Sequence, residues 1–168
     1  MLPFVNEDLG LVRIRPVCDE DLEAVMALAP RLAEGVAAWR DPEGAMRAAR
    51  EWLAGSLAAA ESRRGAVFVA VDSGDSQVVG VVSVQRQLHF TGAMDAYVGE
   101  LAVHPRAVRA GVGRRLMAAA EDWARQQGLR HLTLETGAAN TAARRFYAAL
   151  GYLEEGVRLT RSLETATL

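Results

Sequence analysis

The spacing of hydrophobic residues along the chain predicts a mixture of strands and helices. Residues 11–15 alternate between apolar and polar side chains up to Pro16, which predicts a short edge strand. After Asp19, a candidate helix N-cap, apolar residues recur at helical spacing as far as Pro30 and predict a first helix. A second helix is predicted to begin at Asp41-Pro42, with an apolar stripe made of Ala45, Ala49, Trp52, Leu53 and Leu57.

Valine-rich segments then predict the centre of a sheet. Residues 66–72 and 78–86 are separated by the turn sequence SGDSQ, so we expect an antiparallel hairpin. Further strands are predicted over residues 97–103 and 131–135, and residues 152–163 are expected to form the final strand.

Two more helices are predicted, one before and one after the strand at residues 131–135. The first has a strongly apolar face and ends before Gly128; its stripe is Val112, Leu116, Ala119, Ala120 and Trp123. The second covers residues 141–150, with Asn140 as its N-cap and Gly151 closing it. The expected fold class is therefore α+β, an α/β sandwich with a mixed, mostly antiparallel sheet flanked by helices.

Length and composition favour one globular domain over residues 1–168, with 51% hydrophobic and 24% charged residues. A net charge of −2 argues against general nucleic-acid binding. Uninterrupted apolar stretches long enough for a membrane span are absent, and the first ten residues do not resemble a secretory signal, so we expect a cytoplasmic protein without a membrane partner. The Ala, Arg, Val and Gly bias suggests a GC-rich bacterial source.

The nineteen basic residues are all arginine, and the sequence contains no lysine. This excludes the lysine-dependent phosphate-binding loop of NTPases and Schiff-base chemistry. Cys18 is the one cysteine and is expected to be a small buried residue rather than a nucleophile. His89, His104 and His131 lack metal-ligand spacing, so no metal is implied.

The segment YVGELAVHPRAVRAGVGRRLMAAAEDWA combines a buried strand, an Arg-Gly loop and an amphipathic helix. Free N–H groups at the start of the helix, together with Arg106, Arg109 and Arg114 nearby, would attract an anion such as a pyrophosphate. Gly111 and Gly113 would allow close approach. A dinucleotide site of the G-x-G-x-x-G type is an alternative, but Leu116 stands at its third small position and seven residues separate the strand from the first glycine.

The same segment resembles the cofactor site of the GNAT superfamily of N-acetyltransferases. Residues 108–113, VRAGVG, match the glycine positions of the family loop [Q/R]-x-x-G-x-[G/A], with Val108 replacing the first residue. The phrase GELAVHP before the loop and NTAARRFYAALGY after it strengthen the resemblance. It implies acetyl-CoA as cosubstrate, bound where two central strands of the sheet part.

The resemblance also implies roles for individual residues. The strand before the loop would pair with the pantetheine arm, the loop and first helical turn would hold the pyrophosphate, and the later helix would add contacts. The implied cofactor-binding residues are Leu101, Ala102, Val103, Arg109, Ala110, Gly111, Val112, Gly113, Arg114, Asn140, Ala143 and Tyr147.

Tyr147 is by resemblance the general acid for the departing thiolate, although a core aromatic is the alternative. An alkylamine with a pKa near 10.4 is uncharged in only about one molecule in 2,500 at pH 7, so a base is needed. Glu100 is the candidate base; its alternative is a solvent-facing strand residue. We expect direct attack on the thioester by the amine of a small molecule or peptide. A non-catalytic acyl-CoA sensor, a longer acyl chain and a homodimer remain open.

Overall fold

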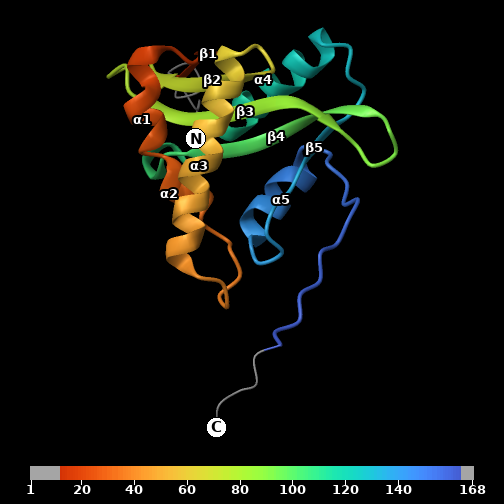
Figure 1. Ribbon diagram of the computed structural model, residues 1–168. Helices are drawn as coiled ribbons and strands as arrows, with labels where there is room; N and C mark the ends of the chain where they lie inside the picture. Colours follow the sequence, from red (N-terminus) through yellow and green to blue (C-terminus); the bar gives the residue numbers. More distant parts are fainter. Residues whose placement is uncertain (1–11, 164–168) are drawn as a thin grey trace, which may run out of the picture.

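Five strands form one sheet in the computed structural model, which describes residues 12–163 (Figure 1). The strands follow chain order across the sheet, and the first four pair antiparallel while the fifth pairs parallel with the fourth. The bounds are β1 Val12–Pro16, β2 Gly65–Asp72, β3 Val78–Leu88, β4 Met94–Val103 and β5 Leu132–Leu134. The expected mixed, mostly antiparallel sheet is confirmed.

Helices cover both faces of the sheet. One face carries the 3-10 helix η2 (Asp19–Asp21), α1 (Leu22–Met26), α2 (Ala29–Leu32) and α3 (Pro42–Glu61). The other face carries α4 (Val112–Gln126), which follows the 3-10 helix η3 (Pro105–Ala107), and side chains of α5 (Thr141–Ala149) pack against the same cluster.

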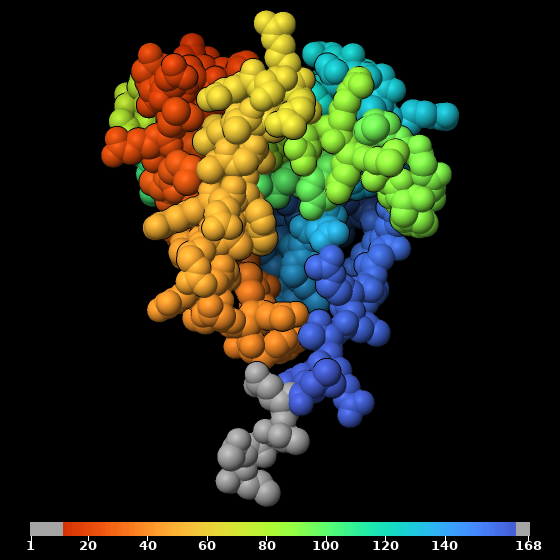
Figure 2. All heavy atoms as spheres, viewed as in Figure 1, coloured from red at the N-terminus to blue at the C-terminus, as the bar shows by residue number. Residues whose placement is uncertain are grey.

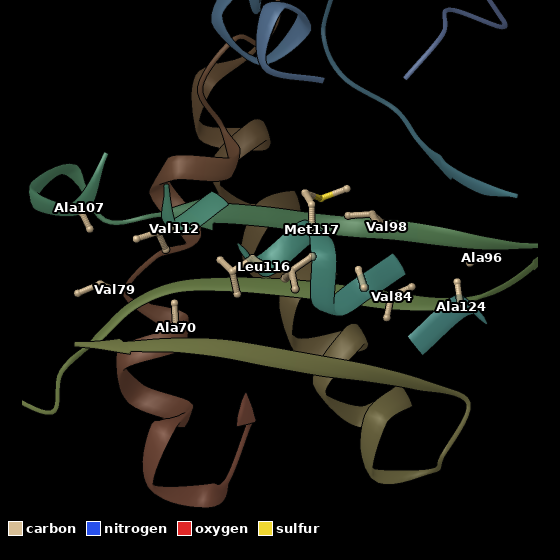
Figure 3. Packing of buried hydrophobic residues seen from close by; sticks show 12 residues of the cluster. Ala70, Val79, Val84, Ala96, Val98, Ala107, Val112, Leu116, Met117 and Ala124 are labelled. Atoms are coloured by element: carbon tan, nitrogen blue, oxygen red, sulfur yellow. The ribbon is translucent and has the colours of Figure 1, made fainter. Parts of the chain in front are cut away.

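The buried strands place adjacent side chains in opposite cores, as the two-residue period of a strand requires. Val82 and Val84 of β3 pack with α4, whereas Val81 packs with α1 and α3. Leu116 and Met117 of α4 are fully buried against the strands (Figure 3). Burial of such side chains contributes roughly 1.5–3 kcal/mol each, so α4 is fixed firmly on the sheet.

The N-terminal helix differs from its prediction. It is divided into η2, α1 and α2, because Pro30 lies in the first turn of α2, where a missing N–H is tolerated. Asp19 lies inside η2 rather than capping it, and the N-cap is Cys18. In α3, Asp41 is the cap as predicted, accepting from the N–H groups of Glu43 and Gly44, but Trp52 is 58% exposed and does not belong to the buried stripe.

The predicted final strand is wrong. Residues 152–163 form no strand, and their leucine and valine side chains (Leu153, Val157, Leu159 and Leu163) are 81–92% exposed. The short β5 offers few backbone groups for pairing, and Glu154-Glu155-Gly156 interrupts the alternation that the prediction used. The segment extends away from the sheet (Figure 1).

Candidate active site

β4 and β5 separate part-way along the sheet, which opens an edge of β4. Their pairing extends only from Ala96 opposite Leu132 to Val98 opposite Leu134. Beyond Val98, β4 continues to Val103 with β3 on one side and no strand on the other. The N–H of His104 donates to Val79 of β3, so strand alternation turns the backbone groups of Val103 and Leu101 toward the open edge.

Arg31 of α2 contacts this open edge. Its Nε donates to the carbonyl oxygen of Val103 at 3.0 Å, and its guanidinium also pairs with Glu34. Exposed strand groups need a partner from outside the sheet. The carbonyl of Val103 therefore bonds to the side chain of Arg31 rather than to a neighbouring strand. A ligand at this edge can take the place of that side chain.

The loop after β4 leads to a helix terminus without a side-chain cap. Gly111, the N-cap of α4, has φ +77° and gives no capping hydrogen bond, whereas Asp41 caps α3 and Asn140 caps α5. Glycine suits this left-handed conformation, and Arg109 nearby also has a positive φ of 67°. The first N–H groups of α4 and its positive dipole end are thus available to an anion.

Two details of the anion site predicted around the Arg-Gly loop are corrected by the structure. A Cβ on Gly113 would lie 3.2 Å from the ring of Phe146, so this glycine allows α4 to approach α5 rather than leaving space for a ligand. Arg106 is directed to Asp75, with a shortest N–O distance of 2.7 Å, rather than being free for the anion. The backbone contribution of Gly113 stays a prediction.

Asn140 and Ala143 are brought together at the start of α5. The Asn140 Oδ1 accepts the backbone N–H of Ala143 at 3.1 Å, which confirms the cap. The Asn140 amide also donates to the carbonyl of Glu34 at 3.5 Å. Asn140 therefore joins α5 to the loop that follows α2, and its contact with a cofactor stays a prediction.

Two glycines make this junction close enough to act as a clip between the two loops. The carbonyl oxygen of Gly35 occupies the space that a Cβ on Gly137 would need, and Gly35 itself has φ +80°. A Cβ on Gly35 would stand 2.5 Å from the Cβ of Asn140. The Gly35–Gly137 clip thus connects the α2–α3 loop to the β5–α5 loop.

Glu100 is buried rather than facing solvent. It is 5% exposed and lies at a bulge where Ser83 of β3 stands opposite both Gly99 and Glu100. The Glu100 N–H donates to Ser83 Oγ at 3.0 Å, and the hydroxyl donates to the Glu100 carboxylate. The side chain of Ser56 on α3 lies close to Gly99, which places this group on the α3 face of the sheet.

Ser83 is not among the site residues predicted from the sequence. The signal that could have found it is a single hydroxyl within the valine-rich stretch of β3, where a buried polar group needs a partner. Tyr97 is a second addition near the strand separation: the pKa of its phenol is raised by burial and then by the charges of Glu135 and Glu100.

Tyr147 lies on the other side of the sheet from Glu100. Its ring packs edge-on against Phe146 and Tyr152, with centroids 5.2 and 5.7 Å away, and it joins the cluster beneath α4. Burial raises the pKa of Tyr147 to about 12, so the phenol keeps its proton at neutral pH.

The surface is recessed between α3 and the segment 152–163, with α5 visible at the bottom of the recess (Figure 2). The recess borders α3, the helix whose Ser56 lies close to Gly99, the residue next to Glu100. A second molecule could therefore approach the strand separation from this side.

The cysteine and the histidines form no catalytic or metal-binding arrangement among residues 12–163. Cys18 is exposed, contrary to the expectation of burial, and a hydrogen bond to Asp21 raises the pKa of its thiol, which disfavours the nucleophilic thiolate. His131 pairs with Asp95 at 3.3 Å and His89 with Glu155 at 3.5 Å. Across residues 12–163 the structure contains no His, Cys, Asp and Glu grouping suited to a metal ion and no helix able to span a membrane.

The sequence of the chain also matches a known protein family. The acetyltransferase (GNAT) family matches residues 24–152. The chain belongs to this family. The resemblance noted in the sequence is confirmed.

Two relatives illustrate the similarity. Aminoalkylphosphonate N-acetyltransferase of Salmonella typhimurium is 34% identical over 90 residues, which cover 53% of this GNAT chain and 58% of that protein. Aminoglycoside N(6')-acetyltransferase type 1 of Stenotrophomonas maltophilia is 36% identical over 108 residues, which cover 62% of this chain and 68% of that protein. The match to the Salmonella protein thus spans less than two thirds of its length.

Solved structures share the GNAT fold. An acetyltransferase of Trypanosoma brucei aligns with a TM-score of 0.65 and 19% identity, covering 90% of this chain and 99% of that one. The enzyme AAC(6')-Iy, in complex with the bisubstrate analog CoA-S-monomethyl-acetylneamine, aligns with a TM-score of 0.64 and 22% identity over 90% of this chain and 97% of that one. At these identities the likeness shows the fold alone.

Proposed function

We propose that this protein is an acetyl-CoA-dependent N-acetyltransferase that transfers the acetyl group directly to an acceptor amine in a ternary complex. The observation that carries the proposal is the continuity of an open strand edge with an uncapped helix terminus. Backbone groups of Leu101 and Val103 line the edge, and the chain then reaches the N-terminus of α4 at Gly111. A long molecule with a peptide-like arm and a pyrophosphate fits this order of groups.

The arm of the cosubstrate would pair with Leu101 and Val103, on either side of Ala102, which requires Arg31 to release the Val103 carbonyl or to share it. The pyrophosphate would lie against the N–H groups of residues 109–114, and Asn140 and Ala143 would add contacts from α5. Acetyl-CoA supplies an activated thioester. The backbone N–H groups at the open edge would polarise its carbonyl.

Glu100 would take the proton from the incoming ammonium. Its carboxylate is held in one orientation by Ser83, and its burial keeps competing water away. A fixed base is needed because the ammonium form of an alkylamine dominates at neutral pH. Ser83 is a positioning residue in this proposal, since it acts through Glu100.

Tyr147 would share its proton with the departing thiolate. A phenol whose pKa is about 12 is fully protonated during turnover, so it is always available as a donor. A covalent acetyl-enzyme is not required. The chain has no lysine, and the Cys18 thiol is a weak nucleophile because its pKa is raised.

The acceptor is proposed to be a small molecule with a primary amine. The named relatives acetylate an aminoalkylphosphonate and aminoglycosides, both of which are small amines. The recess beside α3 is open to such a molecule (Figure 2). Which amine is accepted depends on loops such as 33–41.

A thiol-release assay with acetyl-CoA over a panel of primary amines tests the function. We expect turnover with at least one amine, a product heavier by one acetyl group, and loss of turnover by about 10²-fold or more in Glu100→Gln. Propionyl-CoA and longer thioesters in the same assay define the acyl preference. Acetyl-CoA binding without turnover on any amine would instead favour a non-catalytic sensor and contradict the proposal.

A further inference from the structure

Three arginine side chains converge on one hollow that the proposed active site does not use. Arg63 and Arg64 follow α3, Arg86 lies near the end of β3, and Trp123 and Gln127 at the end of α4 complete a cavity of about 470 Å³. Small-molecule sites commonly have about 300–1,000 Å³. The 15 residues of α4 separate this hollow from the uncapped helix terminus by about 22 Å, so the two regions are distinct.

The positive charges in this hollow are not neutralised by carboxylates. Within residues 12–163, Arg63, Arg64 and Arg86 form no ion pair, although arginines elsewhere, such as Arg106 and Arg125, do. Like charges that share one cavity repel, and the repulsion is relieved when an anion binds between them. The charge distribution therefore favours an anionic ligand.

Arg86 is held in place by the end of α4. It donates to the backbone carbonyl of Gln127 at 3.2 Å and to the side-chain oxygen at 3.4 Å. Carbonyl groups at a helix C-terminus carry partial negative charge, which would otherwise disfavour an anion here. The contact offsets that charge and fixes the direction of one guanidinium.

The backbone of Arg63 supplies an independent observation. Its φ is 57°, and it closes α3 with a pair of hydrogen bonds, from Arg63 N–H to Ala60 and from Arg64 N–H to Ala59, at 3.0 and 2.9 Å. This is the Schellman arrangement, in which glycine is the favoured residue at the left-handed position. An arginine there lowers stability relative to glycine, and strained residues of this kind occur at functional sites.

We propose that this hollow, lined by Arg63, Arg64, Arg86, Trp123 and Gln127, binds a small organic anion that carries at least two phosphate or carboxylate groups. Guanidinium groups bind both kinds of anion through paired N–H donors. The indole of Trp123 offers an apolar wall for the rest of the ligand. The site is separate from the one proposed for acetyl-CoA.

Nuclear magnetic resonance of the indole N–H groups tests the site, because the chain has three tryptophans and each gives one signal. Pyrophosphate and citrate serve as the phosphate and carboxylate probes, with sodium chloride at matched ionic strength as the control. We expect the Trp123 signal to shift and saturate with a Kd below about 1 mM for at least one probe. The probe that gives the saturable shift identifies the class of anion. No saturable shift with either probe would overturn the proposal.

Arg63→Gly separates binding from folding. It should raise the melting temperature, because glycine suits the left-handed position, and it should weaken probe binding at Trp123 by about tenfold. Arg50→Ala, which removes an exposed arginine of α3 outside the hollow, is the matched control and should leave binding unchanged. If Arg63→Gly raises stability but binds as wild type, or if both variants weaken binding equally, the assignment of Arg63 is wrong.

Discussion

The hydroxyl of Ser83 makes two hydrogen bonds with Glu100: it accepts the backbone N–H at 3.0 Å and donates to the carboxylate. One small side chain on β3 thus fixes both the bulge in β4 and the direction of the only acidic group buried at the strand separation among residues 12–163. The proposed base is therefore held by the sheet itself rather than by a loop.

Ser83→Ala should lower kcat by about tenfold while leaving the Kd for acetyl-CoA unchanged, because the carboxylate loses its donor but the cofactor groups are untouched. Steady-state kinetics and calorimetry measure the two quantities. Ser56→Ala is the control, since this hydroxyl lies near Gly99 and forms no hydrogen bond with Glu100. An equal loss in both variants would mean that Ser83 has a packing role only.

Tyr147→Phe should lower kcat by about 10 to 10⁴ with little change in the KM for acetyl-CoA. Phenylalanine keeps the edge-on packing with Phe146 and Tyr152 and removes only the hydroxyl. The control measurement is the melting temperature, which should stay within a few degrees of wild type. Wild-type turnover in the variant from pH 6 to 9 would show that another group protonates the thiolate.

The buried phenols predict a loss of stability at high pH. Tyr147 has a pKa of about 12 in the folded protein and about 10 when unfolded, so the folded state holds this proton more tightly. Below about pH 9 the phenol is protonated in both states, so it adds no pH dependence to the free energy of unfolding. As pH rises from about 10 to 12, the phenol ionises in the unfolded state alone, and the free energy of unfolding falls. Urea denaturation between pH 8 and 10.5 should show this fall.

Tyr147→Phe should reduce the alkaline slope without abolishing it, because the pKa of Tyr152 is also raised, first by burial and then by Glu121. A slope identical to that of wild type would contradict the burial of the Tyr147 hydroxyl.

Gly137→Ala should disturb the clip between the α2–α3 and β5–α5 loops. The new Cβ would overlap the carbonyl oxygen of Gly35, so one loop must move. We expect a loss of about 1–3 kcal/mol in unfolding free energy and a higher KM for the amine. Gly156→Ala, where no atom lies within 4 Å of the added Cβ, should leave both values near wild type. A change in acetyl-CoA binding alone would assign the clip to the cofactor side.

Much of the architecture followed from local patterns. The valine hairpin, the Asp41 and Asn140 caps and the apolar face of α4 each rest on residues close in sequence, and all are confirmed. The final strand failed because pairing depends on the length of β5, which a pattern within residues 152–163 does not contain.

Less of the candidate site than of the fold could be predicted from the sequence. The burial of Glu100 depends on a bulge, and its partner Ser83 lies seventeen residues earlier on another strand. Likewise, Gly113 looked like space for a ligand until α5 placed Phe146 against it. Such contacts join residues that no local pattern relates.

Calorimetric titration of acetyl-CoA into wild type and Gly111→Asp tests whether the N-terminus of α4 binds the cosubstrate. Aspartate tolerates the left-handed backbone of Gly111, but its carboxylate would neutralise the α4 terminus and repel the pyrophosphate. Gly156→Asp adds the same charge at an open position and serves as the control. We expect one site in wild type and in the control, and affinity weaker by about 100-fold, or about 2.7 kcal/mol, in Gly111→Asp. Equal affinity in all three folded proteins would contradict it.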